Sequence, residues 1–140
     1  PQGSINTRTF TINNSGGYPA TAMTGSGLAA PFSFVGGAYP GTLGTCTTTL
    51  AAGANCTIVV TYAPVALGLA TDTILIDYND GATSQQAQRN IQGTGVPPAV
   101  LTITDGPSYD FGIQATTSLT DHTFTITNTG GFIASSITGS

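Results

Sequence analysis

The chain has 140 residues, and only 6% of them are charged, against roughly 25% in typical soluble domains. Its formal net charge is −4 and its cations are Arg8 and Arg89, which argues against nucleic acid and anionic membranes as partners, because both are bound by clustered cations. The sequence contains no long apolar run, so we expect no membrane insertion.

Lysine and glutamate are absent, whereas threonine occurs 26 times and glycine 19 times. Lysine and glutamate favour exposed helix positions, whereas threonine favours strands and glycine favours turns. The composition therefore predicts an all-β fold.

Alternating apolar and polar residues predict short antiparallel strands separated by turns. The expected strands, in chain order, span residues 8–13, 20–24, 31–35, 56–62, 69–78, 85–92, 100–104 and 119–128, with a further short piece at 109–112. This spacing is typical of a β-sandwich. We expect the glycine pairs at 16–17 and 130–131 to supply the positive φ that a turn requires.

One face of these strands is apolar, and its side chains are expected to form the core, because alternate residues of a strand point to opposite faces. The expected core residues are Phe10, Ile12, Ile58, Val60, Tyr62, Ile74, Ile76, Leu101, Ile103, Phe111, Phe124 and Ile126.

The chain has two cysteines, Cys46 and Cys56, on segments that look like facing strands. Their spacing favours a disulfide and hence an oxidising compartment. The alternative is a pair of buried free thiols. A metal site is disfavoured, because the one histidine, His122, is distant in sequence and no second ligand pair exists.

Asn79-Asp80-Gly81 predicts a hairpin turn. With Asp77, the same residues could alternatively supply oxygen ligands to calcium. His122 is interpreted as a surface residue of a strand, because a catalytic base needs an oriented partner. We therefore expect no catalytic residue, no metal and no cofactor.

Three aromatic residues near turns, Tyr18, Tyr39 and Phe132, could form a platform for sugar rings. Packing in the core or at its rim is the favoured interpretation, because buried aromatic rings dominate core energetics.

The chain contains an internal repeat. Ser4–Ser26 and Ser118–Ser140 begin 114 residues apart and are identical at 12 of 23 positions. A period of about 114 residues suits an independently folded domain. We predict that residues 1–96 form one domain that lacks its first strands, that Pro97 and Pro98 form a stiff linker, and that residues 99–140 begin the next repeat.

Four segments resemble the bacterial repeats called choice-of-anchor D, which are related to ASH (abnormal spindle, Hydin) and VesB-type domains. These segments are DFG at 110–112, FTITNTGG at 124–131, CTTTLAAGANCTIVVTYAP at 46–64 and IQGTG at 91–95. The resemblance implies an immunoglobulin-like antiparallel β-sandwich, repeated in tandem on long secreted or surface proteins, without catalytic machinery.

The expected function is that of a structural repeat in an extracellular or cell-surface fibre, stalk or filament. The alternative is an adhesin or carbohydrate-binding module of a secreted protein. We expect no enzymatic activity, and we expect the principal partner to be a neighbouring repeat or subunit of the same kind, arranged head to tail.

Neither end of the chain is expected to be self-sufficient, because a half sandwich exposes apolar side chains and unpaired strand edges. One remedy is a chain that continues covalently on both sides, which is favoured because the second copy stops where the first carries on. The other is a neighbouring subunit that supplies the missing strands.

Overall fold

The computed structural model describes residues 1–139, and over that range it contains strands but no helix. The strands are β1 (Asn6–Asn13), β2 (Thr21–Ser26), β3 (Phe32–Phe34), β4 (Asn55–Tyr62), β5 (Gly68–Asn79), β6 (Ser84–Gly95), β7 (Leu101–Ile103) and β8 (Ile126–Asn128). All of their pairings are antiparallel, which confirms the all-β, antiparallel class. A helix that could span a membrane is accordingly not found in the described part of the chain.

The chain divides into two compact units, Gln2–Gly95 and Val96–Ser140, and Pro1 groups with the second. We call them the N-terminal unit and the C-terminal unit and describe each by itself.

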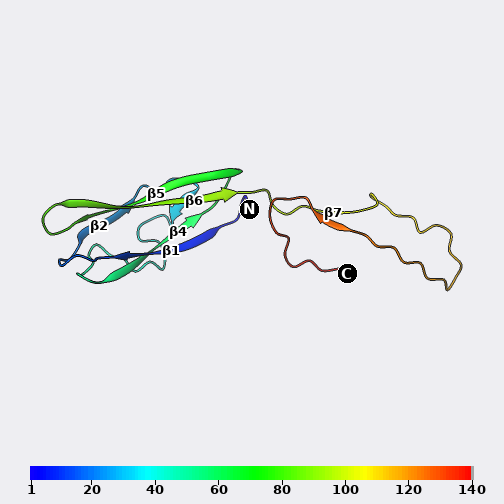
Figure 1. Cartoon of the computed structure of the whole chain (residues 1–140), viewed down its shortest axis with the longest axis horizontal. Helices are drawn as coiled ribbons and strands as arrows, with labels where there is room; N and C mark the ends of the chain where they lie inside the picture. Colours follow the sequence, from blue (N-terminus) through cyan, green and yellow to red (C-terminus); the bar gives the residue numbers. More distant parts are fainter. Residues whose placement is uncertain (140) are drawn as a thin grey trace. The chain divides into compact units, whose positions relative to one another are not determined.

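The N-terminal unit contains two three-stranded sheets with the orders β1-β4-β3 and β2-β5-β6 (Figure 1). The central strands are therefore β4 and β5. β5 and β6 form a long hairpin whose register runs from Gly68 opposite Gly95 to Asn79 opposite Ser84. Two antiparallel sheets that share one core are consistent with a β-sandwich.

The core lies between the two central strands. Ile58 of β4 and Ile74 of β5 are 2% and 1% exposed, and Val60 and Ile76 are buried beside them. Ile74 and Ile76 alternate with more exposed neighbours, as the sequence pattern predicts, whereas Ile58 and Val60 flank Val59, which is also buried. The edge strand β1 contributes less, because Phe10 and Ile12 are only partly buried against this cluster.

Two residues of β4 differ from the expected pattern. Val59 is buried although it alternates with Ile58, because a loop lies against β4 there: Val35 N donates to Val59 O at 3.0 Å, and Val59 N donates to Pro40 O at 2.8 Å. Tyr62, expected in the core, is half-buried at the end of β4 and stacks on Phe32, with ring centroids 4.8 Å apart.

The loop between β3 and β4 closes one side of the N-terminal unit. Ala20 and Leu50 exchange two backbone hydrogen bonds of 2.9 Å, and Met23 N donates to Thr48 O at 2.9 Å. Leu50 and Cys46 are buried in the core cluster. The residues from 46 to 50 therefore cover the side of the core next to β2.

The C-terminal unit contains the pair β7 and β8, in which Leu101, Thr102 and Ile103 lie opposite Asn128, Thr127 and Ile126. The strand expected at 119–128 shrinks to β8, because its partner β7 has only three residues. The piece expected at 109–112 lies outside the strands of this unit.

The apolar residues of this unit that are expected to face a core are exposed, as expected for a half sandwich. All five are between 39% and 62% exposed: Leu101, Ile103, Phe111, Phe124 and Ile126. The physical reason is that the described residues of the unit provide a single two-stranded sheet and no second sheet to pack over it.

We predict that Ile74→Ala lowers the free energy of unfolding of the N-terminal unit by about 2–5 kcal/mol, because it leaves a cavity between the two sheets. Urea denaturation of the chain measures the change. The matched control is Val65→Ala at a site that is 75% exposed, where we expect a change within about 0.5 kcal/mol. Equal effects of the two substitutions would mean that the sheets do not pack through β4 and β5.

Candidate functional site

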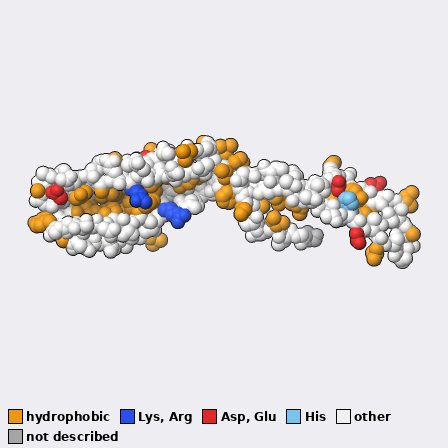
Figure 2. All heavy atoms as spheres, in the orientation of Figure 1, with side chains coloured by type: hydrophobic (Ala, Val, Ile, Leu, Met, Phe, Trp, Pro, Cys, Tyr) orange, Lys and Arg blue, Asp and Glu red, His pale blue; other side chains and the backbone are white. Residues whose placement is uncertain are grey.

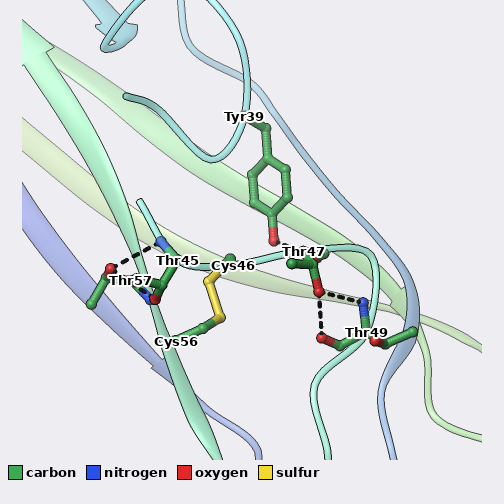
Figure 3. The surroundings of a disulfide bond; sticks show 7 residues. All are labelled: Tyr39, Thr45, Cys46, Thr47, Thr49, Cys56 and Thr57. Carbon is green, nitrogen blue, oxygen red and sulfur yellow. Dashed lines mark hydrogen bonds between the residues drawn. A yellow bond between two sulfur atoms is a disulfide. The ribbon is translucent and has the colours of Figure 1, made fainter. Parts of the chain in front are cut away.

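A disulfide joins Cys46, in the loop that closes the core, to Cys56 on β4 (Figure 3). Cys56 lies on β4, whereas Cys46 lies in the loop rather than on the facing strand expected from the sequence. Their Cα atoms are 4.8 Å apart, and both residues are buried. Because disulfides persist in oxidising environments, this bond fits a protein of an oxidising compartment.

Threonine residues hold the same loop to β4. Thr45 N donates to Thr57 O at 2.9 Å, and Thr57 N donates to Thr45 Oγ1 at 2.9 Å. Thr47 Oγ1 donates to Thr49 O at 3.0 Å, and the dashed lines in Figure 3 mark several of these bonds. The Thr45–Thr57 bonds therefore tie the loop to β4 next to the disulfide, whereas the Thr47–Thr49 bond lies within the loop.

Tyr39 and Tyr18, the two aromatic residues near turns of the N-terminal unit, have different surroundings. The Tyr39 ring meets Phe34 edge to face at 5.9 Å, and its hydroxyl donates to Thr47 O at 3.3 Å. Burial raises the pKa of Tyr39. Tyr18, in contrast, is 65% exposed. Tyr39 is thus a packing residue at the rim of the core, as the favoured interpretation has it.

The turn between β5 and β6 uses its polar groups internally. Asp80 Oδ1 accepts hydrogen bonds of 2.8 Å from Ala82 N and Thr83 N, and Asp80 Oδ2 accepts one of 2.9 Å from Gln85 Nε2. The backbone bond from Thr83 makes the largest contribution to a lowered pKa of the Asp80 carboxyl group. This arrangement favours the turn interpretation over a calcium site, because the carboxylate already has its donors.

In the C-terminal unit His122 has a partner that sequence reasoning missed. His122 Nε2 lies 2.7 Å from Asp105 Oδ2, and the Tyr109 ring stacks on the imidazole with centroids 4.0 Å apart. Phe124 meets the imidazole edge to face at 4.8 Å. Asp105 follows β7 and His122 precedes β8, so the antiparallel register of these strands was the signal that could have revealed the pair.

Groups of three or more His, Cys, Asp or Glu side chains suited to hold a metal ion are not found in residues 1–139. Asp105 and His122 therefore remain a pair, and the chemistry that they support is an ion pair when the imidazole is protonated.

A groove runs along the N-terminal unit between β1 and β6. In the described structure β1 pairs only with β4 and β6 pairs only with β5, so each forms an edge of its sheet. The groove is lined by apolar side chains from both sheets: Phe10, Ile12, Ile58, Ile74, Ile76 and Ala87. Figure 2 shows hydrophobic side chains along this hollow and arginine side chains beside it. The groove continues past Ile12 along residues 13–18.

The two copies of the internal repeat form the same hydrogen bonds. Asn14 Nδ2 donates to Tyr18 O at 2.9 Å, and its counterpart Asn128 Nδ2 donates to Phe132 O at 2.7 Å. Gly16 N donates to Asn14 Oδ1 at 3.1 Å, and Gly130 N donates to Asn128 Oδ1 at 3.0 Å. The segment after β1 therefore adopts the same local structure as the segment after β8.

The glycine pairs in these segments do not have the positive φ expected of them. A Cβ on Gly130 would collide with Pro98 O and with the backbone of Ala99 and Val100, whereas a Cβ on Gly16 would touch only the Asn14 side chain. In the C-terminal copy glycine is required because another backbone segment approaches closely. In the N-terminal copy the corresponding space is open.

No protein-family model matches the chain, and no curated protein matches it. Among solved structures, the chain is similar to the VesB protease of Vibrio cholerae, with a TM-score of 0.56 and 21% sequence identity. The match covers 68% of this chain but 28% of the protease chain. At this identity the likeness shows a shared fold for that part of the protease.

This likeness corrects the expectation that the protein has no enzymatic role. A solved structure that shares the fold is that of a protease, so the fold occurs within the chain of an enzyme. A fold of this kind therefore gives no ground for excluding an enzymatic context.

We predict that the variant with Cys46→Ser and Cys56→Ser unfolds more easily than the wild type by about 2–4 kcal/mol, because the short closed loop no longer restricts the unfolded chain. Urea denaturation of both proteins measures the difference. Rapid labelling of the native, unreduced chain by iodoacetamide would contradict the disulfide itself.

We predict that the Asp80 carboxyl group titrates below the ordinary aspartate value of about 3.9. Its stabilisation of the turn is complete above that value and is lost as the pH falls through the lowered folded-state pKa. Carboxyl-carbon NMR titration measures the midpoint. Gln85→Ala should move the midpoint upwards because one donor is lost, whereas Gln86→Ala, whose amide binds Asp77 instead, should leave it in place.

Proposed function

We propose that the chain is a structural repeat of an extracellular or cell-surface fibre, stalk or filament, assembled head to tail from immunoglobulin-like domains. The observation that carries the proposal is the internal repeat. Residues that lie 114 positions apart in the sequence, Asn14 and Asn128, bind equivalent backbone atoms. A second start of the same domain within one chain is typical of a tandem array.

The disulfide, the scarcity of lysine and arginine, and the two prolines between the units support this role. The disulfide between Cys46 and Cys56 suits a protein outside the cell. With two arginines and no lysine, the chain offers few cleavage sites to trypsin-like proteases. Pro97 and Pro98 join the two units through residues whose φ is restricted. A stiff, protease-resistant array of small domains is what a fibre exposed to the medium requires.

The sheet arrangement also supports the resemblance to the choice-of-anchor D repeats. The two sheets of the N-terminal unit have β4 and β5 at their centres, and their shared core contains the disulfide. A sandwich with a buried disulfide is a common form of the immunoglobulin-like fold.

A second candidate function is a β-sheet domain within the chain of a secreted protease. The likeness to the VesB protease favours it, since the match covers 28% of that chain. In this case the enzyme's remaining sequence would lie in the same polypeptide as the present chain.

The test uses antibodies raised against the 140-residue chain. We expect gold-labelled antibodies to decorate extended fibres on the cell surface at regular intervals in electron micrographs. Peptide sequencing of the reduced native polypeptide distinguishes the two candidates: repeated copies of related domains support the fibre, and a protease sequence supports the second candidate. Labelling confined to the cell interior would overturn both.

A further inference from the structure

We propose that the groove between β1 and β6 binds residues 100–104 of a second copy of this chain as an added strand, antiparallel to β1, with Asp105 of that copy next to Arg8. The inference rests on the proposed function, because it names the contact through which successive copies join. Four features of the described residues support it.

The first feature is the backbone at the free edge of β1. Asn14 N donates to Ala54 O, and Asn14 O accepts from Gly53 N, so the backbone of Asn14 faces the side of β4. Backbone groups of alternate residues in an antiparallel strand point to opposite sides. Thr11 and Asn13 therefore direct their N–H and C=O groups away from β4, towards the groove, where an added strand can pair with them.

The second feature is that the C-terminal unit already shows this pairing. β8 is the repeat counterpart of residues 12–14, and its partner is β7. Thr104 N donates to Thr125 O at 3.0 Å, and Thr129 N donates to Val100 O at 2.8 Å. Thr125, whose backbone binds β7, is the counterpart of Thr11, whose backbone points away from β4. The edge of β8 that pairs with β7 therefore corresponds to the unpaired edge of β1.

The same register can be transferred to the groove. Ile103 lies opposite Ile126, and the counterpart of Ile126 is Ile12, which lines the groove. Leu101 and Ile103 would then both face the apolar floor, while Thr102 lies opposite Asn13 on the outer side. The transfer breaks the pairing of β7 with β8 and of Asp105 with His122 within the second copy. Equivalent backbone bonds form with β1 instead, and Leu101 and Ile103, which are exposed in the C-terminal unit, gain the apolar floor of the groove and leave water.

The third feature is the glycine pair that follows β1. Gly130 and Gly131 are packed against Pro97, Pro98 and the residues that lead into β7. Gly16 has only its neighbour Asn14 within 4 Å of an added Cβ, and Gly17 has no atom within that distance. Gly16 and Gly17 thus leave room for the backbone of an incoming strand, and no strand of the described chain occupies that room.

The fourth feature is charge. In the C-terminal unit Asp105 pairs with His122 at 2.7 Å, and the repeat counterpart of His122 is Arg8. Arg8 makes no ion pair in the part of the chain that the structure describes. An added strand in the transferred register brings Asp105 diagonally across from Arg8, at the distance at which cross-strand pairs interact. The acceptor site therefore carries a charge opposite to that of its occupant.

Register-specific cross-linking tests the contact in the full 140-residue chain. One sample of chain carries Asn13→Cys, a second carries Thr102→Cys, and the two are mixed in a glutathione redox buffer. We expect a disulfide-linked product of about twice the mass of one chain, because paired strands place Cα atoms about 5.5 Å apart, within the range of a disulfide. The matched control replaces Asn13→Cys by Thr9→Cys, which lies on the same outer side about four residues away and should give no such product.

A charge exchange tests the ion pair. Arg8→Asp and Asp105→Arg should each weaken self-association about tenfold in sedimentation equilibrium, because each places like charges together. The variant that carries both substitutions should recover the wild-type affinity. Asp121→Arg, a charge change of the same size one residue before His122, should leave the affinity unchanged. All of these positions are exposed, and circular dichroism checks that each variant keeps the β-sheet fold.

A groove-blocking variant completes the test. Gly17→Val, at a position where an added Cβ meets no atom within 4 Å, should leave the stability of the N-terminal unit unchanged within about 0.5 kcal/mol and should abolish the cross-link, because the counterpart Gly131 is packed against Pro97. A chain that stays monomeric, equal cross-linking of the Asn13→Cys and Thr9→Cys variants, or a charge exchange that fails to restore affinity each overturns the proposal. If gold-labelled fibres are still seen on cells in that event, the proposed function stands and the copies join through another surface.

Discussion

The N-terminal unit depends on the contact between its two central strands, β4 and β5. Ile58 and Ile74 are the largest side chains that are almost fully buried, and they come from these two strands. Each remaining strand of the unit is attached to β4 or β5 by a backbone ladder. Because burial of apolar surface is the main favourable term in folding, this contact keeps the two sheets together and every edge strand in place.

The core is covered on one of its sides and reaches a groove on the other. On the side of β2, residues 46–50 run between the sheets and are fastened by the disulfide to Cys56 and by the paired hydrogen bonds of Ala20 and Leu50. On the side of β1 and β6 the same apolar layer reaches the floor of a groove. Among residues 2–95, the disulfide and these backbone bonds therefore close the side of β2, whereas an apolar groove lies on the side of β1 and β6.

Most of the N-terminal unit could be predicted from the sequence, because period-two alternation reports directly which face of a strand is buried. Ile58 and Ile74 follow this rule. The burial of Val59 does not, because it depends on a loop that pairs with the edge of β4 next to β3. The pairing of Asp105 with His122 likewise required the register of β7 and β8. Local patterns predict faces, whereas these contacts depend on which distant segments become neighbours.

The edges of the sheets show which of them are protected against further pairing. Soluble proteins shield edge strands by shortening them, by bulges, by proline or by lysine. β3 has three residues, and β2 carries a register shift between Thr21 and Thr24. β1 and β6 have 8 and 12 residues, contain neither proline nor lysine, and pair with their partners in a continuous register. Their only charged side chains are Arg8 and Arg89. The short strand β3 and the irregular strand β2 are therefore poor partners for an added strand, whereas β1 and β6 are long and regular and carry one charge each. These two longer edges flank the same apolar groove, and strand addition meets the least opposition there.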